Sequence, residues 1–140
     1  MPEGVITCRG TVYPWHCDHM GHMNVMWYVG KFDEATWQFF AALGLPRSRF
    51  SRDGTGMAAV EQHIEYKREL RAGDLITIRS RVLEVKEKSI RFAHDMTNDE
   101  NGELVARTVI VGVYFDTALR KARPLASDIS QRAELMIMKT

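Results

Sequence analysis

The sequence has little of several features that mark specialised classes of protein. Its 140 residues include only two cysteines, Cys8 and Cys17, and four prolines. Two cysteines do not make a disulfide framework, so we expect two free thiols in a reducing compartment. No apolar run approaches the roughly 20 residues that span a membrane, and the first residues lack the charged and apolar stretches of a signal peptide. The sequence therefore predicts a cytoplasmic protein with no membrane span.

Neither sign of charge is in excess. Nineteen lysines and arginines stand against 18 acidic residues, and the net charge is +1. A nearly neutral chain has no basic surface for nucleic acid and no polybasic arm for a membrane. We therefore expect neither partner, and any anionic ligand must meet a local basic group. The length fits one domain, residues 1–140, because a chain of this size buries roughly 70% of its unfolded surface.

One segment has the pattern of a long helix. Between positions 25 and 42 apolar residues recur at intervals of three and four, the spacing of a helix face. Asn24 suits an N-cap, and Gly44 suits the end of the helix. Further apolar residues widen the face, namely Met26, Val29, Trp37, Phe40 and Leu43. A helix that is apolar on most sides predicts a buried helix with other elements wrapped around it.

Strand-like segments surround this helix. They are rich in β-branched and aromatic residues, are separated by turn sequences, and span residues 5–13, 57–70, 74–85, 89–96 and 104–115. We expect the last four to form consecutive antiparallel hairpins. The run 109–115 does not alternate with polar residues, which predicts a strand covered on both faces, on the outside by a partner subunit. The segment from Ser127 to Lys139 predicts a terminal helix, with the side chain of Asp128 exposed to solvent.

Reactive side chains are most concentrated directly before the predicted helix. The segment from His16 to His22 reads His-Cys-Asp-His-Met-Gly-His, and such irregular connections often carry catalytic groups. Zinc accepts these donors, but no second ligand pair follows at a usual spacing, since His63 and His94 stand alone in predicted strands. A nucleophilic pair of Cys17 with a histidine is disfavoured because the neighbouring Asp18 opposes the thiolate. We therefore expect no metal and no thiol nucleophile.

An ordered set of short motifs carries a resemblance to a known family. The set comprises Asp18-His19-Met20-Gly21-His22-Met23-Asn24, then Tyr28, Asp33, Gly44-Leu45-Pro46 and Lys88-Ser89. Over about residues 5–117 the chain resembles the hotdog-fold acyl-CoA thioesterases of the 4-hydroxybenzoyl-CoA thioesterase branch. The resemblance implies an α+β hotdog fold, in which a curved antiparallel sheet wraps a long central helix. It also implies a thioester hydrolase that acts on acyl-CoA without a further cofactor and assembles as a homodimer or homotetramer.

The same resemblance implies roles for individual residues. Asp18 is the catalytic carboxylate, as nucleophile or as general base on water. The backbone N–H of Val25 polarises the thioester carbonyl, since a helix N-terminus offers unpaired donors and a favourable dipole. His22 either orders the loop or acts on the reaction, by contacting the thioester or tuning the carboxylate. Asn24 either caps the helix or orients water or substrate. Whether His16 and His19 take part in the chemistry stays open.

Further assignments concern the two ends of the substrate. Lys86 and Lys88 occupy the turn where the resemblance implies contacts with the CoA phosphates, although Glu87 interrupts them and an ordinary solvated turn is the alternative. Glu61 is an alternative catalytic acid, as in another branch of the fold. Aromatic and methionine side chains suit an acyl pocket as well as an ordinary core; they are Met23, Trp27, Trp37, Phe39, Phe40 and Met57.

Two other functions compete with hydrolysis. The hotdog fold also serves acyl-thioester hydratases and dehydratases, whose loop resembles Asp-x-Asn-Pro followed by a small apolar residue and His. Here Asp18 and His22 lie four positions apart without such a proline, which favours hydrolysis. A non-catalytic module that binds acyl-CoA or an acyl carrier would keep the pocket and the oligomer but tolerate the loss of Asp18.

Overall fold

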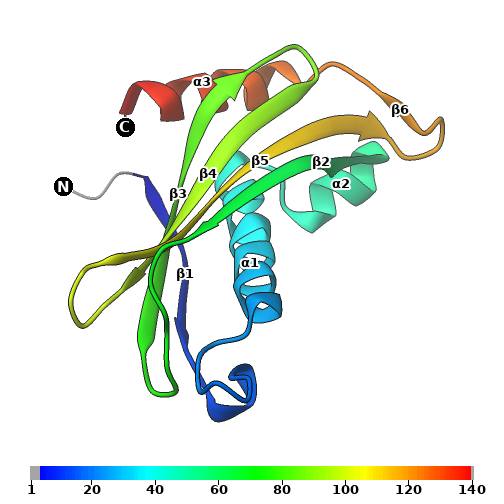
Figure 1. The fold of residues 1–140 in the computed structure, drawn as a ribbon. Helices are drawn as coiled ribbons and strands as arrows, with labels where there is room; N and C mark the ends of the chain where they lie inside the picture. The colour runs from blue at the N-terminus through cyan, green and yellow to red at the C-terminus, as the bar shows by residue number, and fades with distance from the viewer. Residues whose placement is uncertain (1–3, 140) are drawn as a thin grey trace.

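The computed structural model describes residues 4–139 of the chain. Figure 1 shows a strongly curved sheet with the long helix lying along its concave side. In chain order the elements are β1 (Val5–Thr11), the 3-10 helix η1 (Pro14–His16), α1 (Val25–Leu43), α2 (Arg47–Asp53), β2 (Thr55–Tyr66), β3 (Leu75–Val85), β4 (Ser89–Asn98), β5 (Leu104–Asp116), β6 (Lys121–Ala122) and α3 (Ser127–Lys139). Within the described residues, no helix is both long enough and apolar enough to cross a membrane.

The sheet is antiparallel, with its strands in the order β1-β3-β4-β5-β2 and the short β6 beside β5. A long helix wrapped by such a sheet confirms the α+β hotdog fold. The prediction of consecutive hairpins is correct for β3, β4 and β5 but wrong for β2, which pairs with β5 at the sheet edge. The connection 67–74 carries the chain across to β3, and there Leu70 accepts a backbone hydrogen bond of 2.7 Å from the N–H of Met23.

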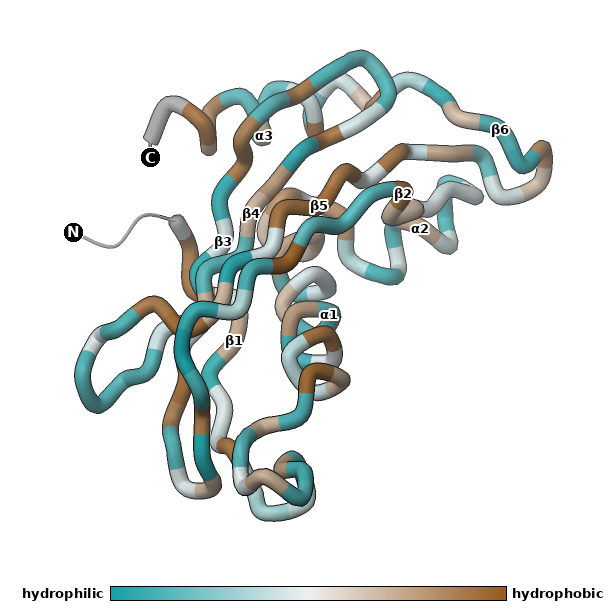
Figure 2. Tube along the Cα trace, viewed as in Figure 1, coloured by the Kyte–Doolittle hydropathy of each residue, from teal (hydrophilic) through white to brown (hydrophobic). Residues whose placement is uncertain are grey.

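Helix α1 begins and ends where its cap residues predict. Asn24 Oδ1 accepts a hydrogen bond of 3.0 Å from the N–H of Met26, and Gly44 adopts the left-handed conformation (φ 96°) that ends many helices. In Figure 2 hydrophobic and hydrophilic residues alternate along α1. The prediction of burial on most sides is wrong for the single chain, because Met26, Val29 and Trp37 are 63%, 41% and 55% exposed. One side of the helix therefore stays open.

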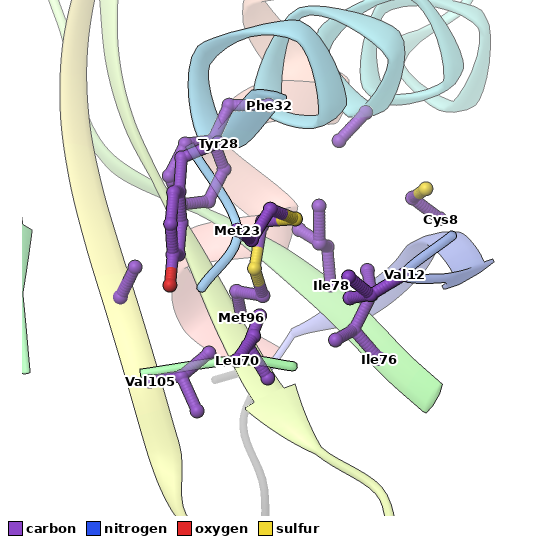
Figure 3. Close-up of a cluster of buried hydrophobic side chains, with 12 residues drawn as sticks. Cys8, Val12, Met23, Tyr28, Phe32, Leu70, Ile76, Ile78, Met96 and Val105 are labelled. Carbon is purple, nitrogen blue, oxygen red and sulfur yellow. The ribbon is translucent and has the colours of Figure 1, made fainter. Parts of the chain in front are cut away.

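The buried side of α1 divides the core into two clusters. Near the start of the helix, Tyr28 and Phe32 pack against Leu70, Ile78 and Met96, as Figure 3 shows. Near its end, a second cluster joins the helix to β4 and α3 and contains Phe39, Leu43, Ile90, Phe92 and Ile129. Each large apolar side chain buried in this way contributes roughly 1.5–3 kcal/mol. The packing fixes α1, and hence its N-terminus, against the sheet.

A polar chain crosses the middle of this core. His94 is fully buried on β4. Its Nε2 lies 2.8 Å from Thr36 Oγ1 of α1, and its Nδ1 lies 2.5 Å from Ser80 Oγ of β3. Ser80 Oγ in turn lies 2.7 Å from Thr7 Oγ1 of β1. Burial lowers the pKa of His94 to about 4, so the imidazole is neutral near neutral pH.

The terminal helix α3 pairs with α2 through an ion pair. Helix α3 spans the predicted residues, and Asp128 is exposed as predicted. In addition, Arg49 of α2 binds both of its carboxylate oxygens at 2.5 and 2.8 Å. That hydrogen-bonded pairing lowers the pKa of Asp128 to about 2.

On the outer face of the sheet, Val109, Val111 and Val113 alternate with core residues of β5 and are half-buried. Their covering by a partner subunit remains a prediction.

Candidate active site

The reactive motif folds into a tight loop directly before α1. A β-bridge joins Cys17 to Met23. Inside it, the N–H of Asp18 donates to the carbonyl of His22 at 2.9 Å, and the N–H of Gly21 donates to the carbonyl of Asp18 at 3.0 Å. Gly21 has φ 81°, a conformation that favours glycine because it has no Cβ. The loop therefore holds Asp18 in one place beside the start of the helix.

Asp18 is half-buried as a residue, and its carboxylate is only partly engaged. Its Oδ1 accepts a hydrogen bond of 2.8 Å from the N–H of Met20. Among residues 4–139 no donor reaches Oδ2. One oxygen thus orients the group, while the other is available to take a proton or to attack a carbonyl carbon.

The start of α1 supplies a free donor. Across the described part of the chain, nothing accepts a hydrogen bond from the N–H of Val25. The positive end of the helix dipole lies at the same point. Of the two alternatives for Asn24, the structure shows the cap, because its Oδ1 is engaged by the N–H of Met26.

A cup of about 430 Å³ joins these groups. Asp18, His22, Asn24 and Val25 all line it, so the fold brings the four predicted site residues together. The rest of its wall is formed by Met23, Tyr28, Tyr66, Lys67, Arg68 and Glu69. Sequence reasoning missed the wall contributed by Tyr66 to Glu69, because no local motif marks it and only the pairing of β2 with β5 carries it there.

Contacts across the cup order its two sides. His22 Nε2 lies 2.9 Å from a carboxylate oxygen of Glu69, which ties the loop to the segment after β2. The rings of Tyr28 and Tyr66 meet edge to face, with centroids 5.2 Å apart. Burial raises the pKa of Tyr28 to about 12, and its hydroxyl donates to the carbonyl of Arg68 at 3.4 Å. Tyr28 is therefore a neutral donor at physiological pH.

His16, Cys17 and His19 of the motif do not line the cup. His16 is buried, and its Nδ1 accepts a hydrogen bond of 2.9 Å from the N–H of Tyr13. Burial is the main reason that the pKa of His16 is lowered. Cys17 contacts the carbonyl of Tyr13 at 3.7 Å, and His19 is exposed. Among residues 4–139 no group of histidine, cysteine and acidic side chains is arranged to hold a metal ion.

A second hollow lies further along α1. This groove, of about 560 Å³, runs between α1, α2, β2 and β5, and we call it the α1–β2 groove. Val25 lines the cup and Val29 lines the groove, so the two hollows lie about one helical turn apart along α1. The residues that line the groove are mostly apolar and include Val29, Trp37, Phe40, Phe50, Met57, Phe92, Ile110 and Phe115.

The groove separates the predicted acyl-pocket residues into two groups. Trp37, Phe40 and Met57 line it. The other three do not: Met23 lines the cup, Trp27 packs against the ring of His16, and Phe39 is fully buried in the core.

Three further predicted site residues lie away from Asp18. Lys86 and Lys88 occupy the turn between β3 and β4, at the opposite end of the molecule from the start of α1 (Figure 1). Glu61 is exposed at an irregularity of β2 and lines neither hollow. A single chain therefore does not bring the two lysines to the cup.

A carboxylate beside an unpaired helix N–H, on a hotdog fold, is an arrangement suited to acyl-transfer hydrolysis. The Thioesterase-like superfamily matches residues 12–133. The chain belongs to this family, and it is a thioester hydrolase.

Individual relatives are similar over most of the chain. The long-chain acyl-CoA thioesterase FadM of Escherichia coli (strain K12) is 27% identical over 127 residues, which cover 88% of this chain and 92% of FadM. The L-carnitine dehydrogenase/betainyl-CoA thioesterase of Agrobacterium fabrum is 31% identical over 100 residues, 71% of this chain but 20% of that longer protein. The hypothetical protein SAV2348 from Staphylococcus aureus, solved in complex with CoA, shares the fold with a TM-score of 0.91 at 18% identity, over 100% of this chain and 89% of that one.

Proposed function

We propose that this protein hydrolyses acyl-CoA thioesters in the cup, with Asp18 and the N–H of Val25 as its reacting groups. The observation that carries the proposal is their shared cup, where one oxygen of the carboxylate and the helix N–H are both without protein partners among residues 4–139. A thioester carbonyl oxygen seated at the start of α1 receives a hydrogen bond that strengthens as negative charge develops on it. Removing one such donor typically lowers the rate about 100- to 1,000-fold.

Asp18 supplies the second half of the reaction by one of two routes. As a general base, its Oδ2 takes a proton from water while the water oxygen bonds to the carbonyl carbon. The C–S bond then breaks, and the thiolate of CoA leaves and takes up the proton. As a nucleophile, Oδ2 itself bonds to the carbonyl carbon and expels the thiolate, and water then cleaves the resulting anhydride.

His22 acts in this proposal by positioning. Its contact with Glu69 joins the loop that carries Asp18 to the opposite wall of the cup. Both side chains line the cup, so a substrate that enters meets a loop held from two sides. Asn24 contributes through the cap, which fixes the first turn of α1 and with it the direction of the Val25 N–H.

The acyl group is assigned to the α1–β2 groove. The groove follows the cup along α1, is lined mainly by apolar side chains, and falls within the usual size of ligand pockets, about 300–1,000 Å³. The similarity to a long-chain acyl-CoA thioesterase supports an apolar acyl group. Asp33, which lines the same groove, offers a carboxylate to any acyl group with a polar or cationic end, such as the betainyl group named for the Agrobacterium relative.

The proposal also includes assembly of the chain into a homodimer or homotetramer. Strand β2 forms an edge of the sheet over its 12 residues, and its Val60 is 61% exposed. A long edge strand offers unpaired N–H and C=O groups to another chain. A homodimer formed there, or a homotetramer, would cover the exposed side of α1. It would also allow Lys86 and Lys88 of another subunit to approach the CoA phosphates.

A substrate panel tests the activity itself. Purified protein is mixed with acyl-CoAs of different acyl groups, and released thiol is measured with a chromogenic reagent. Turnover of at least one acyl-CoA is expected. Tight binding of acyl-CoA without thiol release would contradict the proposal in favour of a binding module, and addition of water to an enoyl-CoA would favour a hydratase.

Single-turnover hydrolysis in heavy-oxygen water then separates the two routes. In the nucleophilic route water cleaves the anhydride, and attack at the side-chain carbonyl leaves heavy oxygen in the Asp18 peptide. In the general-base route the label appears only in the released acid. Mass analysis of the peptide and of the acid gives the answer.

A further inference from the structure

Two glycines line the α1–β2 groove on neighbouring strands, and neither is required by its backbone. Gly56 lies on β2 and Gly112 on β5, and neither has a positive φ. Glycine weakens the interior of a strand and often marks a position where another group approaches closely. At these two positions the absent side chain, rather than the backbone conformation, is the feature to explain.

The space left by each glycine is occupied by a neighbour. A Cβ at Gly112 would lie 2.9 Å from Cε of Met57 and 3.6 Å from Cε1 of Phe92. A Cβ at Gly56 would lie 2.9 Å from the ring of Phe115. All five residues line the groove. The end of the Met57 side chain therefore lies where a residue at position 112 would place its first side-chain atom.

This contact lies at the end of the groove remote from the cup. The ring of Phe92 is 5.8 Å from that of Phe40, and Phe40 is about four helical turns beyond Val25 on α1. A methionine side chain is unbranched and adapts its shape to what it touches. Met57 can thus extend into the space above Gly112 or withdraw from it without a change of the backbone.

We propose that Gly112 and Met57 set the length of acyl chain that the enzyme accepts. The inference rests on the proposed function and names its substrate class, straight acyl chains long enough to reach the far end of the groove. With no side chain at position 112, the terminal methylenes of a long chain occupy the floor of the groove while the end of Met57 moves aside. A shorter chain leaves the end of Met57 over Gly112, and only the far end of the groove stays filled by that side chain.

Substitutions at position 112 test the proposal. Gly112→Ala and Gly112→Val are compared with the parent protein on butanoyl-, octanoyl-, dodecanoyl- and hexadecanoyl-CoA. For the longest chain kcat/KM is expected to fall at least tenfold, because one methylene in an apolar pocket changes this ratio about 10- to 200-fold. For butanoyl-CoA it is expected to stay within about twofold of the parent. Val111→Ile is the matched control, since it adds one carbon to the opposite face of the same strand.

The reciprocal variant makes the test independent of any damage to the strand. Met57→Ala opens the floor and is expected to shift the preference toward the longest chain. The double variant Met57→Ala/Gly112→Ala is expected to recover at least part of the long-chain kcat/KM lost in Gly112→Ala. Equal loss at every chain length, or an unchanged preference in all variants, would overturn the proposal.

The outcome separates this inference from the proposed function. Hydrolysis by the parent protein tests the function, while the order of preference among chain lengths tests the inference. If the parent hydrolyses none of the series, non-hydrolysable thioether analogues of the same lengths are titrated by calorimetry. The Gly112 variants must then lose at least tenfold in affinity for the longest analogue alone, and equal affinities would overturn the inference.

Discussion

His94 places a titratable ring in the centre of the core, between α1 and the sheet. Thr36 donates its hydroxyl proton to the carbonyl of Phe32 at 3.0 Å. The Thr36 oxygen then accepts from Nε2 of His94, and Nδ1 accepts from Ser80. Since Thr36 also lines the α1–β2 groove, this chain of hydrogen bonds keeps the Thr36 hydroxyl engaged and favours an apolar groove wall.

Because the ring of His94 is buried, we expect the folded protein to lose stability in mild acid. The pKa of His94 is about 4 in the folded protein, and a histidine in an unfolded chain has a pKa of about 6.5. Between these values the unfolded state binds a proton that the folded state does not. The free energy of unfolding should therefore fall by roughly 3 kcal/mol as the pH decreases through this interval.

Urea unfolding across that pH interval measures the effect. His94→Gln, which keeps a polar side chain but cannot titrate, is expected to show a flatter dependence on pH even if it is less stable at every pH. An equal slope in the parent and the variant would assign the acid sensitivity to other groups.

Among the residues that line the cup, only those in a local motif could be predicted to lie together. Asp18, Asn24 and Val25 follow one another closely before and at the start of a helix whose spacing and caps are readable in the sequence. Tyr66 and Glu69 lie more than forty residues further along the chain. Their arrival at the cup depends on which strand β2 pairs with, and no local signal fixes that.

At the scale of elements, the N-cap of α1 links stability to the site. Asn24→Ala removes the acceptor for the N–H of Met26, and losing such a cap typically costs about 1 kcal/mol. Asn24→Ser keeps a hydroxyl acceptor and should retain most of that stability. The same order is expected in thiol release, because a frayed first turn misdirects the N–H of Val25.

Thermal unfolding and thiol release measured on both variants give the comparison. A serine variant with parent-like stability but no activity would instead assign Asn24 a direct part in the reaction.

Elements were predictable in proportion to the strength of their patterns. Helix α1 and strands β3 to β5 follow from apolar spacing, caps and turns. Helix α2 buries none of its residues, so no apolar periodicity marks it. The partner of β2 was predicted wrongly because the 67–74 connection contains the same turn residues that a hairpin would use, although it crosses the sheet to β3, the neighbour of the opposite edge strand β1.

At the scale of the whole molecule, the exposed side of α1 and the edge strand β2 predict assembly. Val29 and Trp37 are exposed on the helix and Val60 on the strand, which is a costly surface for a single chain to leave in water. Val60→Lys should shift the protein toward a monomer and reduce thiol release. Ile6→Lys is the matched control, because Ile6 is an exposed apolar residue on the opposite edge strand, β1.

Sedimentation velocity of the parent and both variants gives their masses. A parent protein that is monomeric while fully active would contradict the assembly.

The central claim is that Asp18 carries the reaction, and one substitution tests it most directly. Asp18→Asn keeps the size of the side chain and an oxygen for the N–H of Met20, but it removes the base or nucleophile. His19→Asn, at the exposed neighbouring position, is the control. With the acyl-CoA that the parent turns over best, kcat of Asp18→Asn should fall about 100- to 10,000-fold, while the control and the affinity for substrate change little. Undiminished thiol release by a folded Asp18→Asn variant would contradict the account.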